Sequence, residues 1–259
     1  MNHAVTFELA GGVARVTLSR PEAGNTMNLQ VGRDLLDAAR RCAGERTVRA
    51  VVISGAGKAF SFGGDLSAMM LNGSDGAEAY LRELTVDLHA AIVAFSRLRA
   101  PVIAAVNGTA AGAGVGLVAM ADLAVAAEGA KFVLAYTGIG LTPDGGTSYF
   151  LPRTVGHKRS MELALCNRTL TATEALQWGL VNKVVPDAEV LVEAGRIADQ
   201  LAAGPPSALA HAKRLMRSEA SLEAQLEDES RTIARQGATT EAREGIAAFL
   251  EKRKPDFQR

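Results

Sequence analysis

Two glycine-rich stretches carry features that could stabilise a negatively charged oxygen during a reaction. GAGKAFSFGGDL occupies residues 55–66, and NGTAAGAGVGLVAMAD occupies residues 107–122. Each follows a short apolar run and leads into a helix-forming segment, so unpaired backbone N–H groups are expected at each turn. Either stretch alone could be a plain turn or a site of close helix packing. Together they indicate one oxyanion site built from two backbone donors.

Neither stretch fits a nucleotide-binding loop. GAGK lacks the earlier glycine of a phosphate-binding loop, because position 52 is valine. Gly112, Gly114 and Gly116 are spaced GxGxG rather than GxGxxG, which makes a dinucleotide fingerprint a weak interpretation.

A third stretch, LTPDGGTSY at residues 141–149, places Asp144 before two glycines. The carboxylate could be catalytic, or it could cap the helix that follows, since aspartate is common at both places. The residues alone leave both interpretations open.

Composition narrows the class of protein. The 259 residues carry 28 basic and 28 acidic side chains and no long basic run, so a nucleic-acid partner is not expected. Two cysteines without a Cys/His cluster predict no metal site and fit a reducing cytoplasm. The apolar stretch 100–127 is interrupted by Asn107, Asp122 and several glycines, so no membrane span is expected.

Periodicity predicts alternating strands and helices in the first two thirds and helices alone afterwards. An α/β core over 1–195 and a C-terminal helical region over 196–259 follow from this change. Strands are expected over 4–10, 13–18, 49–55 and 101–108, with two more in 122–134. Helices are expected over 28–43, 77–98, 112–121, 146–151, 156–166 and 172–178, and within 187–250 with breaks near 204–206 and 218–221.

The combined motifs resemble the enoyl-CoA hydratase/isomerase (crotonase) family over nearly the whole chain. The matching stretches are LSRPEAGNTMN, AFSFGGDL, PVIAAVNGTAAGAGVGL, AKFVLAYTGIGLTPDGGTSYFLPRTVG, ATEALQWGLVNKVV and AFLEKRKPDF. The resemblance implies an α/β crotonase-like spiral of repeated ββα units, with a C-terminal helical trimerisation region. It also implies an acyl-CoA thioester substrate, whose coenzyme A is part of the substrate rather than a tightly bound cofactor.

The resemblance assigns the two oxyanion donors to the N–H groups of Gly64 and Ala113. It also exposes a departure from the hydratases of the family, which place two glutamates around the reacting water. Those positions are Gly116 and Tyr136 here. Adding water across a double bond needs both a base and an acid, so a two-glutamate hydratase does not fit this chain.

Asp144 matches the aspartate of a branch that resembles the ring-opening isomerases of phenylacetate degradation and related enoyl-CoA isomerases. One carboxylate suffices to shift a double bond, because it removes a proton at one carbon and returns it at another. Isomerisation is therefore the preferred reaction.

Two alternatives stay open. The chain also resembles 4-chlorobenzoyl-CoA dehalogenases, which implies Asp144 as nucleophile and His89 as the base that activates water. Tyr136 replaces the tryptophan expected to bond the aspartate in that branch, and its hydroxyl can still donate a hydrogen bond. The other alternative is an acyl-CoA binding protein without catalysis.

The resemblance also implies coenzyme A contacts and an assembly. Arg20, Lys58, Ala59, Ser61, Gly64, Asp65 and Leu66 lie where the family contacts the nucleotide and pantetheine. Phe249 and Lys252 match residues that reach the coenzyme A of a neighbouring subunit, which implies a homotrimer or a dimer of trimers. Residues around 69–90 and 136–140 are expected to line the acyl pocket.

Overall fold

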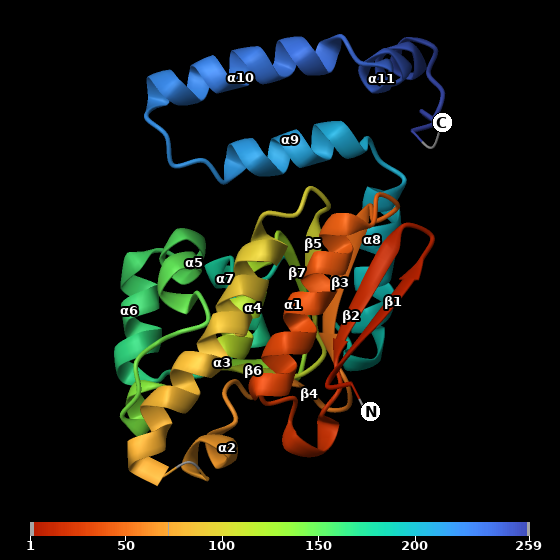
Figure 1. Ribbon diagram of the computed structural model, residues 1–259. Coiled ribbons are helices and arrows are strands. Elements are labelled where there is room, and N and C mark those ends of the chain that lie inside the picture. The colour runs from red at the N-terminus through yellow and green to blue at the C-terminus, as the bar shows by residue number, and fades with distance from the viewer. Residues whose placement is uncertain (1–2, 72, 258–259) are drawn as a thin grey trace.

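The computed structural model describes residues 3–71 and 73–257, and Figure 1 shows their arrangement. The chain opens with an antiparallel hairpin of β1 (Val5–Ala10) and β2 (Val13–Leu18). Gly11 and Gly12 join the strands with φ values of +58° and +82°, the left-handed conformation that a two-residue hairpin turn needs. The predicted hairpin is confirmed.

A six-stranded sheet continues from this hairpin in the order β1-β2-β3-β5-β7-β10. Its remaining strands, all parallel to their neighbours, are β3 (Ala50–Gly55), β5 (Val102–Val106), β7 (Leu123–Ala127) and β10 (Lys183–Val185). All residues of β3 and β5 are buried, as expected of apolar strands covered on both faces. The first three of these strands were predicted, and β10 was not.

A second sheet has four short strands in the order β4-β6-β8-β9. Their bounds are β4 (Ala59–Ser61), β6 (Thr109–Ala111), β8 (Lys131–Val133) and β9 (Leu170–Thr171). Each of the pairs β3–β4, β5–β6 and β7–β8 places one strand in each sheet and then leads into a helix. This threefold repetition is the expected spiral of ββα units.

Helices surround the sheets. The core helices are α1 (Leu29–Gly44), α2 (Leu66–Met70), α3 (Gly73–Ser96), α4 (Ala113–Met120), α5 (Thr147–Thr154), α6 (His157–Cys166) and α7 (Ala172–Trp178). Three 3₁₀ turns accompany them, η1 (Pro21–Ala23), η2 (Thr137–Ile139) and η3 (Asp187–Glu189). Asn28 caps α1 as predicted, because its Oδ1 accepts a hydrogen bond from the Val31 N–H at 3.0 Å.

Four helices follow at the C-terminal end, α8 (Val190–Ala202), α9 (Pro206–Met216), α10 (Leu222–Gly237) and α11 (Thr240–Leu250). The breaks near 204–206 and 218–221 are confirmed, and a further break separates α10 from α11. Figure 1 shows α9, α10 and α11 as a layer set off from the core, with α8 beside the sheet. The division at 195/196 falls inside α8 and stays a prediction.

A charge cluster fastens α9 to the core. The Asp122 carboxylate lies 2.7 Å from Lys213 Nζ and 2.7 Å from Arg217 Nη2. Asp122 also accepts the Val102 N–H at 2.8 Å, which places the cluster at the start of β5, a central strand of the six-stranded sheet. Burial lowers the pKa of Lys213, and the Asp122 charge opposes this shift.

Among the described residues, no helix has both the length and the apolar character to cross a bilayer.

The two cysteines are expected to differ sharply in reactivity. Burial raises the pKa of the Cys42 thiol to about 12, whereas Cys166 is exposed. Because the thiolate is the reactive form, a thiol reagent at pH 8 should modify one cysteine of the native protein and both after denaturation. Equal reaction rates for both thiols in the native protein would contradict this prediction.

The raised pKa of Cys42 also makes the free energy of unfolding depend on pH. The Cys42 thiol loses its proton near pH 9.0 in the unfolded chain but only near pH 12 in the folded one. The stability that the neutral, buried thiol contributes below pH 9.0 is therefore lost as the pH rises toward about 12.

Candidate active site

The two glycine-rich turns meet at one cavity of about 270 Å³. Gly64 and Ala113 both line it. The turns are in close contact, since a Cβ atom placed on Gly63 would lie 3.3 Å from the Gly112 Cα. Gly63 and Gly112 have φ values of +85° and +51°, which other residues rarely adopt.

The N–H groups of Gly64 and Ala113 donate to no protein acceptor in the described part of the chain. Ala113 is the first residue of α4, so its N–H belongs to the unpaired set at a helix N-terminus and is assisted by the helix dipole. The structure therefore brings the two predicted donors to one cavity. Their binding of a thioester oxygen stays a prediction.

Asp144 lines the same cavity. Its Oδ1 accepts a hydrogen bond of 2.5 Å from the Tyr136 hydroxyl. The cap of α5 is Gly146, and the Asp144 backbone carbonyl, rather than its carboxylate, accepts the Thr147 N–H and hydroxyl at 3.0 and 2.7 Å. The interpretation of the Asp144 side chain as a helix cap is therefore wrong. About a third of this side chain is exposed, at 33%.

Tyr136 is buried, with 9% of its surface exposed. Burial first, and then the negative charge of Asp144, raises the pKa of the Tyr136 hydroxyl well above its usual range. The phenol therefore stays protonated at neutral pH and can donate to the carboxylate. Tyr136 holds one oxygen of Asp144 in place and does not bond to the other.

The other Asp144 oxygen faces His89. Oδ2 lies 4.0 Å from His89 Nε2, on α3. The Gly145 N–H donates to the same nitrogen at 3.4 Å, so Nε2 acts as an acceptor in this arrangement. The His89 side chain is 47% exposed, so a water molecule can reach it, although His89 is not among the residues that line the cavity. The sequence left open whether His89 faces Asp144, and in the structure it does.

The Asp144 turn occupies the space beside Gly116. A Cβ atom placed on Gly116 would lie 2.1 Å from the Gly145 carbonyl oxygen, a distance that atoms do not tolerate. Gly145 and Gly146 shape this turn with φ values of +58° and +75°. The position that the resemblance assigns to a hydratase glutamate therefore lacks room for any side chain.

The rest of the cavity wall is mostly hydrocarbon. Its apolar and aromatic lining comprises Phe62, Leu66, Met69, Tyr80, Leu81, Leu84, Leu88, Leu134, Ile139 and Leu141. Most of these residues lie within or next to the two segments predicted to line an acyl pocket, 69–90 and 136–140. Such a wall suits an acyl chain.

Arg20 and Asp65 are bonded to each other rather than free. Arg20 Nη1 lies 3.0 Å from Asp65 Oδ2 and donates to the Thr26 carbonyl at 2.7 Å. Burial alone would raise the pKa of Asp65, but the Ala68 N–H and the Arg20 guanidinium together lower it. The pair fixes the turn that carries Gly64, and its contact with coenzyme A stays a prediction.

The other residues assigned to coenzyme A fall into two groups. Lys58 is exposed in the turn before β4, which contains buried Ala59 and Ser61, and Leu66 is exposed at the cavity. Phe249, 82% exposed, and Lys252 lie at the end of α11, in the layer that Figure 1 shows apart from the core. Their contact with a neighbouring subunit stays a prediction.

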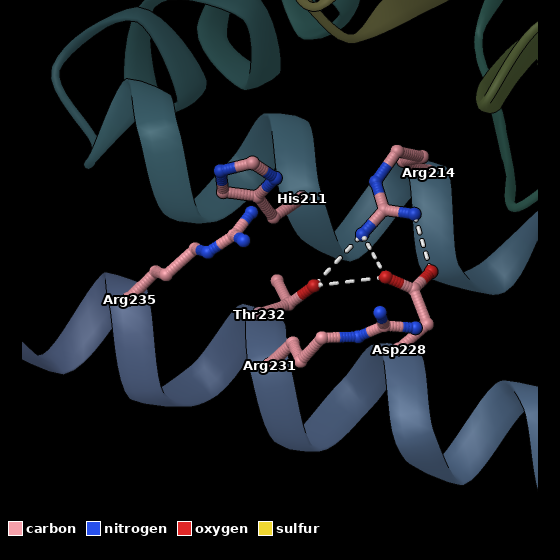
Figure 2. A pocket seen from close by; sticks show the side chains of 6 residues that line it. All are labelled: His211, Arg214, Asp228, Arg231, Thr232 and Arg235. Atoms are coloured by element: carbon pink, nitrogen blue, oxygen red, sulfur yellow. Dashed lines mark hydrogen bonds and ion pairs between the residues drawn. The ribbon is translucent and has the colours of Figure 1, made fainter.

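A second cavity, of about 300 Å³, lies between α9 and α10 (Figure 2). Its lining residues are His211, Arg214, Asp228, Arg231, Thr232 and Arg235. Arg214 pairs with both oxygens of Asp228 and donates to the Thr232 hydroxyl at 2.8 Å. None of the predicted site residues lines this cavity. Across residues 3–71 and 73–257, no group of three or more His, Cys, Asp or Glu side chains is placed to hold a metal ion.

Known proteins resemble this chain in sequence and in fold. The family model described as enoyl-CoA hydratase/isomerase matches residues 8–259. A Rhodobacter capsulatus protein named "Probable enoyl-CoA hydratase" is 41% identical over 98% of both chains. The 4-chlorobenzoyl coenzyme A dehalogenase-2 of Arthrobacter sp. is 38% identical over 79% of this chain and 74% of its own.

Two further similarities cover most of the chain. The 1,2-epoxyphenylacetyl-CoA isomerase of Escherichia coli is 35% identical over 95% of both chains. A crystal structure of an enoyl-CoA hydratase from Polaromonas sp. JS666 superposes with a TM-score of 0.92 at 36% identity, covering 97% of this chain and 98% of that one.

Proposed function

The chain belongs to the enoyl-CoA hydratase/isomerase family, and we propose that it is an enoyl-CoA isomerase in which Asp144 serves as both base and acid. The thioester carbonyl binds between the N–H groups of Gly64 and Ala113. Asp144 removes a proton from C2 of a 3-enoyl-CoA, and the electron pair moves through the double bond to give a dienolate. The same carboxyl group returns the proton to C4, which yields the conjugated 2-enoyl-CoA.

One observation carries the proposal: the cavity offers a single available carboxylate. Asp65 and Asp144 are its only acidic lining residues in the described part of the chain, and Asp65 is tied to Arg20 and to the α2 N-terminus. The crowded position of Gly116 leaves no room for a second carboxylate. A double-bond shift needs one group that takes and returns a proton, whereas hydration needs two.

The test is conversion of trans-3-hexenoyl-CoA by the purified protein. Appearance of trans-2-hexenoyl-CoA supports the proposal. A preparation that instead adds water to trans-2-hexenoyl-CoA, and forms none from the 3-isomer, overturns it. A protein that binds coenzyme A thioesters and turns over no substrate in a broad panel would be an acyl-CoA binding protein.

A second candidate function is hydrolytic dehalogenation of a 4-halobenzoyl-CoA. It is favoured by the placement of His89 Nε2 at 4.0 Å from the Asp144 carboxylate. An Asp144 oxygen would attack ring carbon 4 and expel chloride, leaving an aryl ester. Water, losing a proton to His89, would then cleave the ester at the Asp144 carbonyl carbon. The products are 4-hydroxybenzoyl-CoA, the free carboxylate and HCl.

His89→Gln distinguishes the two reactions. Under dehalogenation the variant should form the ester but not hydrolyse it, because it lacks the base. Incubation with 4-chlorobenzoyl-CoA should then add the mass of the benzoyl-CoA group to the protein, at Asp144. His157→Gln, at the exposed start of α6, is the matched control and should behave as the wild type. Absence of chloride release by the wild type, with no mass increase in His89→Gln, would exclude this candidate.

The proposal extends to assembly and location. A homotrimer or a dimer of trimers in the cytoplasm is proposed. The assembly is supported by large apolar side chains on α10 and α11 that are exposed in the single chain, namely Leu222, Leu226, Ile233, Ile246, Phe249 and Leu250.

A further inference from the structure

Tyr80, on α3, carries a buried hydroxyl without a partner in the wall of the acyl cavity. Only 9% of the residue is exposed. Its hydroxyl oxygen is sealed from solvent and has no hydrogen-bond partner among the described residues. The side chain nevertheless lines the cavity of about 270 Å³ that contains Gly64, Ala113 and Asp144.

A buried hydroxyl without a partner is uncommon, because burial removes its bonds to water and nothing replaces them. Nearby cavity side chains do not compensate, since Met69, Leu81 and Leu84 offer no oxygen or nitrogen acceptor. The charged groups that act on Tyr80 are paired with other side chains, since Asp65 and Arg20 are bonded to each other and Glu83 pairs with Arg33. Burial raises the pKa of Tyr80, so the hydroxyl keeps its proton and remains a donor at neutral pH.

The position of Tyr80 on α3 separates it from the reacting groups. Tyr80, Leu84 and Leu88 follow one another at helical spacing along the cavity, and His89 lies beside Leu88. Nine residues of helix place Tyr80 about 13.5 Å along the axis from His89, at 1.5 Å per residue. The Tyr80 hydroxyl bonds to no described group, Asp144 included. The helix spacing therefore places Tyr80 toward the part of the cavity that lies away from that carboxylate.

We propose that Tyr80 is a specificity-determining residue whose hydroxyl donates a hydrogen bond to an oxygen atom of the acyl group. The substrate class is then acyl-CoA thioesters whose chain carries a hydroxyl, carbonyl or ether oxygen remote from the thioester. Thr85 also lines the cavity, and its hydroxyl donates a hydrogen bond to the Leu81 carbonyl at 2.8 Å. The lone pairs of that hydroxyl can still accept a hydrogen bond from a hydroxyl group of the ligand. The proposal rests on the proposed acyl-CoA function but not on which reaction Asp144 performs.

Binding of saturated thioesters tests this proposal, because they cannot isomerise. The dissociation constants of hexanoyl-CoA, 6-hydroxyhexanoyl-CoA, octanoyl-CoA and 8-hydroxyoctanoyl-CoA are measured by calorimetry. At one of the two lengths the hydroxylated ligand should bind about tenfold more tightly than its parent, the effect of one hydrogen bond to a group otherwise left unpaired. Two lengths are used so that the oxygen is presented at two depths.

Tyr80→Phe should abolish this preference. It keeps the ring and removes only the hydroxyl, so binding of the unsubstituted parent should be unchanged or slightly tighter. Tyr149→Phe is the matched control. Tyr149 lies outside the cavity and donates to Glu219 at 2.6 Å, so the preference should survive its loss.

The outcomes separate the two proposals. Equal binding of parent and hydroxylated ligands by the wild type overturns the role of Tyr80 and leaves acyl-CoA function standing. A preference that persists in Tyr80→Phe also overturns it. If none of the four thioesters binds, the acyl-CoA function fails, and the role of Tyr80 fails with it.

Discussion

Asp144→Asn is expected to lower kcat for trans-3-hexenoyl-CoA isomerisation by about 10²–10⁴-fold, the usual worth of a positioned acid–base group. The amide cannot accept the C2 proton. It can still accept the Tyr136 hydrogen bond through its oxygen, so the turn should keep its shape. Steady-state kinetics of the 2-enoyl product measure the effect.

The loss should lie in kcat, with binding preserved. Hexanoyl-CoA should bind Asp144→Asn with nearly the wild-type dissociation constant, because the oxyanion donors and the apolar wall are untouched. Asp199→Asn, exposed on α8, is the matched control and should retain full activity. Turnover by Asp144→Asn within a few-fold of the wild type would remove the carboxylate from the mechanism.

Ala113→Pro is expected to lower kcat/KM by about 10²–10³-fold, the effect of deleting one oxyanion-hole donor in comparable sites. Proline lacks the N–H that is proposed to bind the thioester oxygen. Its position is favourable for this test, because Ala113 is the first residue of α4 and its N–H bonds to no described protein acceptor. Proline is well tolerated at the first residue of a helix, so the fold should survive.

Thr240→Pro makes the same change at the exposed first residue of α11 and serves as the matched control. Its activity should equal that of the wild type. Circular dichroism of both variants verifies that the helices are intact. Wild-type kcat/KM in a folded Ala113→Pro would mean that the thioester oxygen binds elsewhere.

The long elements of this fold were predictable, whereas most strands of two or three residues were not. The hairpin of β1 and β2 and the helix α1 each extend over enough residues to show a period. Strands β4, β6 and β9 have two or three residues, which cannot display alternation, yet they form most of the second sheet. They exist because β4 pairs with β6, β6 with β8 and β8 with β9, and this pairing joins segments that are far apart in the sequence.

The two candidate oxyanion donors could be predicted from the sequence, whereas the orientation of the candidate acid–base side chains could not. Glycine-rich turns before helices indicate free N–H groups wherever they occur. The orientation of His89 depends on how α3 packs against a turn 56 residues away in the sequence. Tyr80 belongs to an apolar helical stripe and is indistinguishable there from a core tyrosine. The absence of a partner for its hydroxyl is visible only in three dimensions.

The structure gives a physical reason for the glycine at position 116. From the sequence, Gly116 is only a missing glutamate. In the structure, the Gly145 carbonyl occupies the space of a side chain at position 116. The loop that carries Asp144 therefore fills the place that the glutamate side chain would need.

The most direct measurement is a crystal structure of Asp144→Asn with trans-3-hexenoyl-CoA bound. We expect the thioester oxygen at about 2.7–3.1 Å from the N–H nitrogens of both Gly64 and Ala113. We also expect C2 and C4 of the acyl chain on the same face, each about 3–3.5 Å from the residue 144 side chain. A thioester oxygen bound away from these two nitrogens, or a residue 144 side chain beyond reach of both carbons, would contradict this expectation.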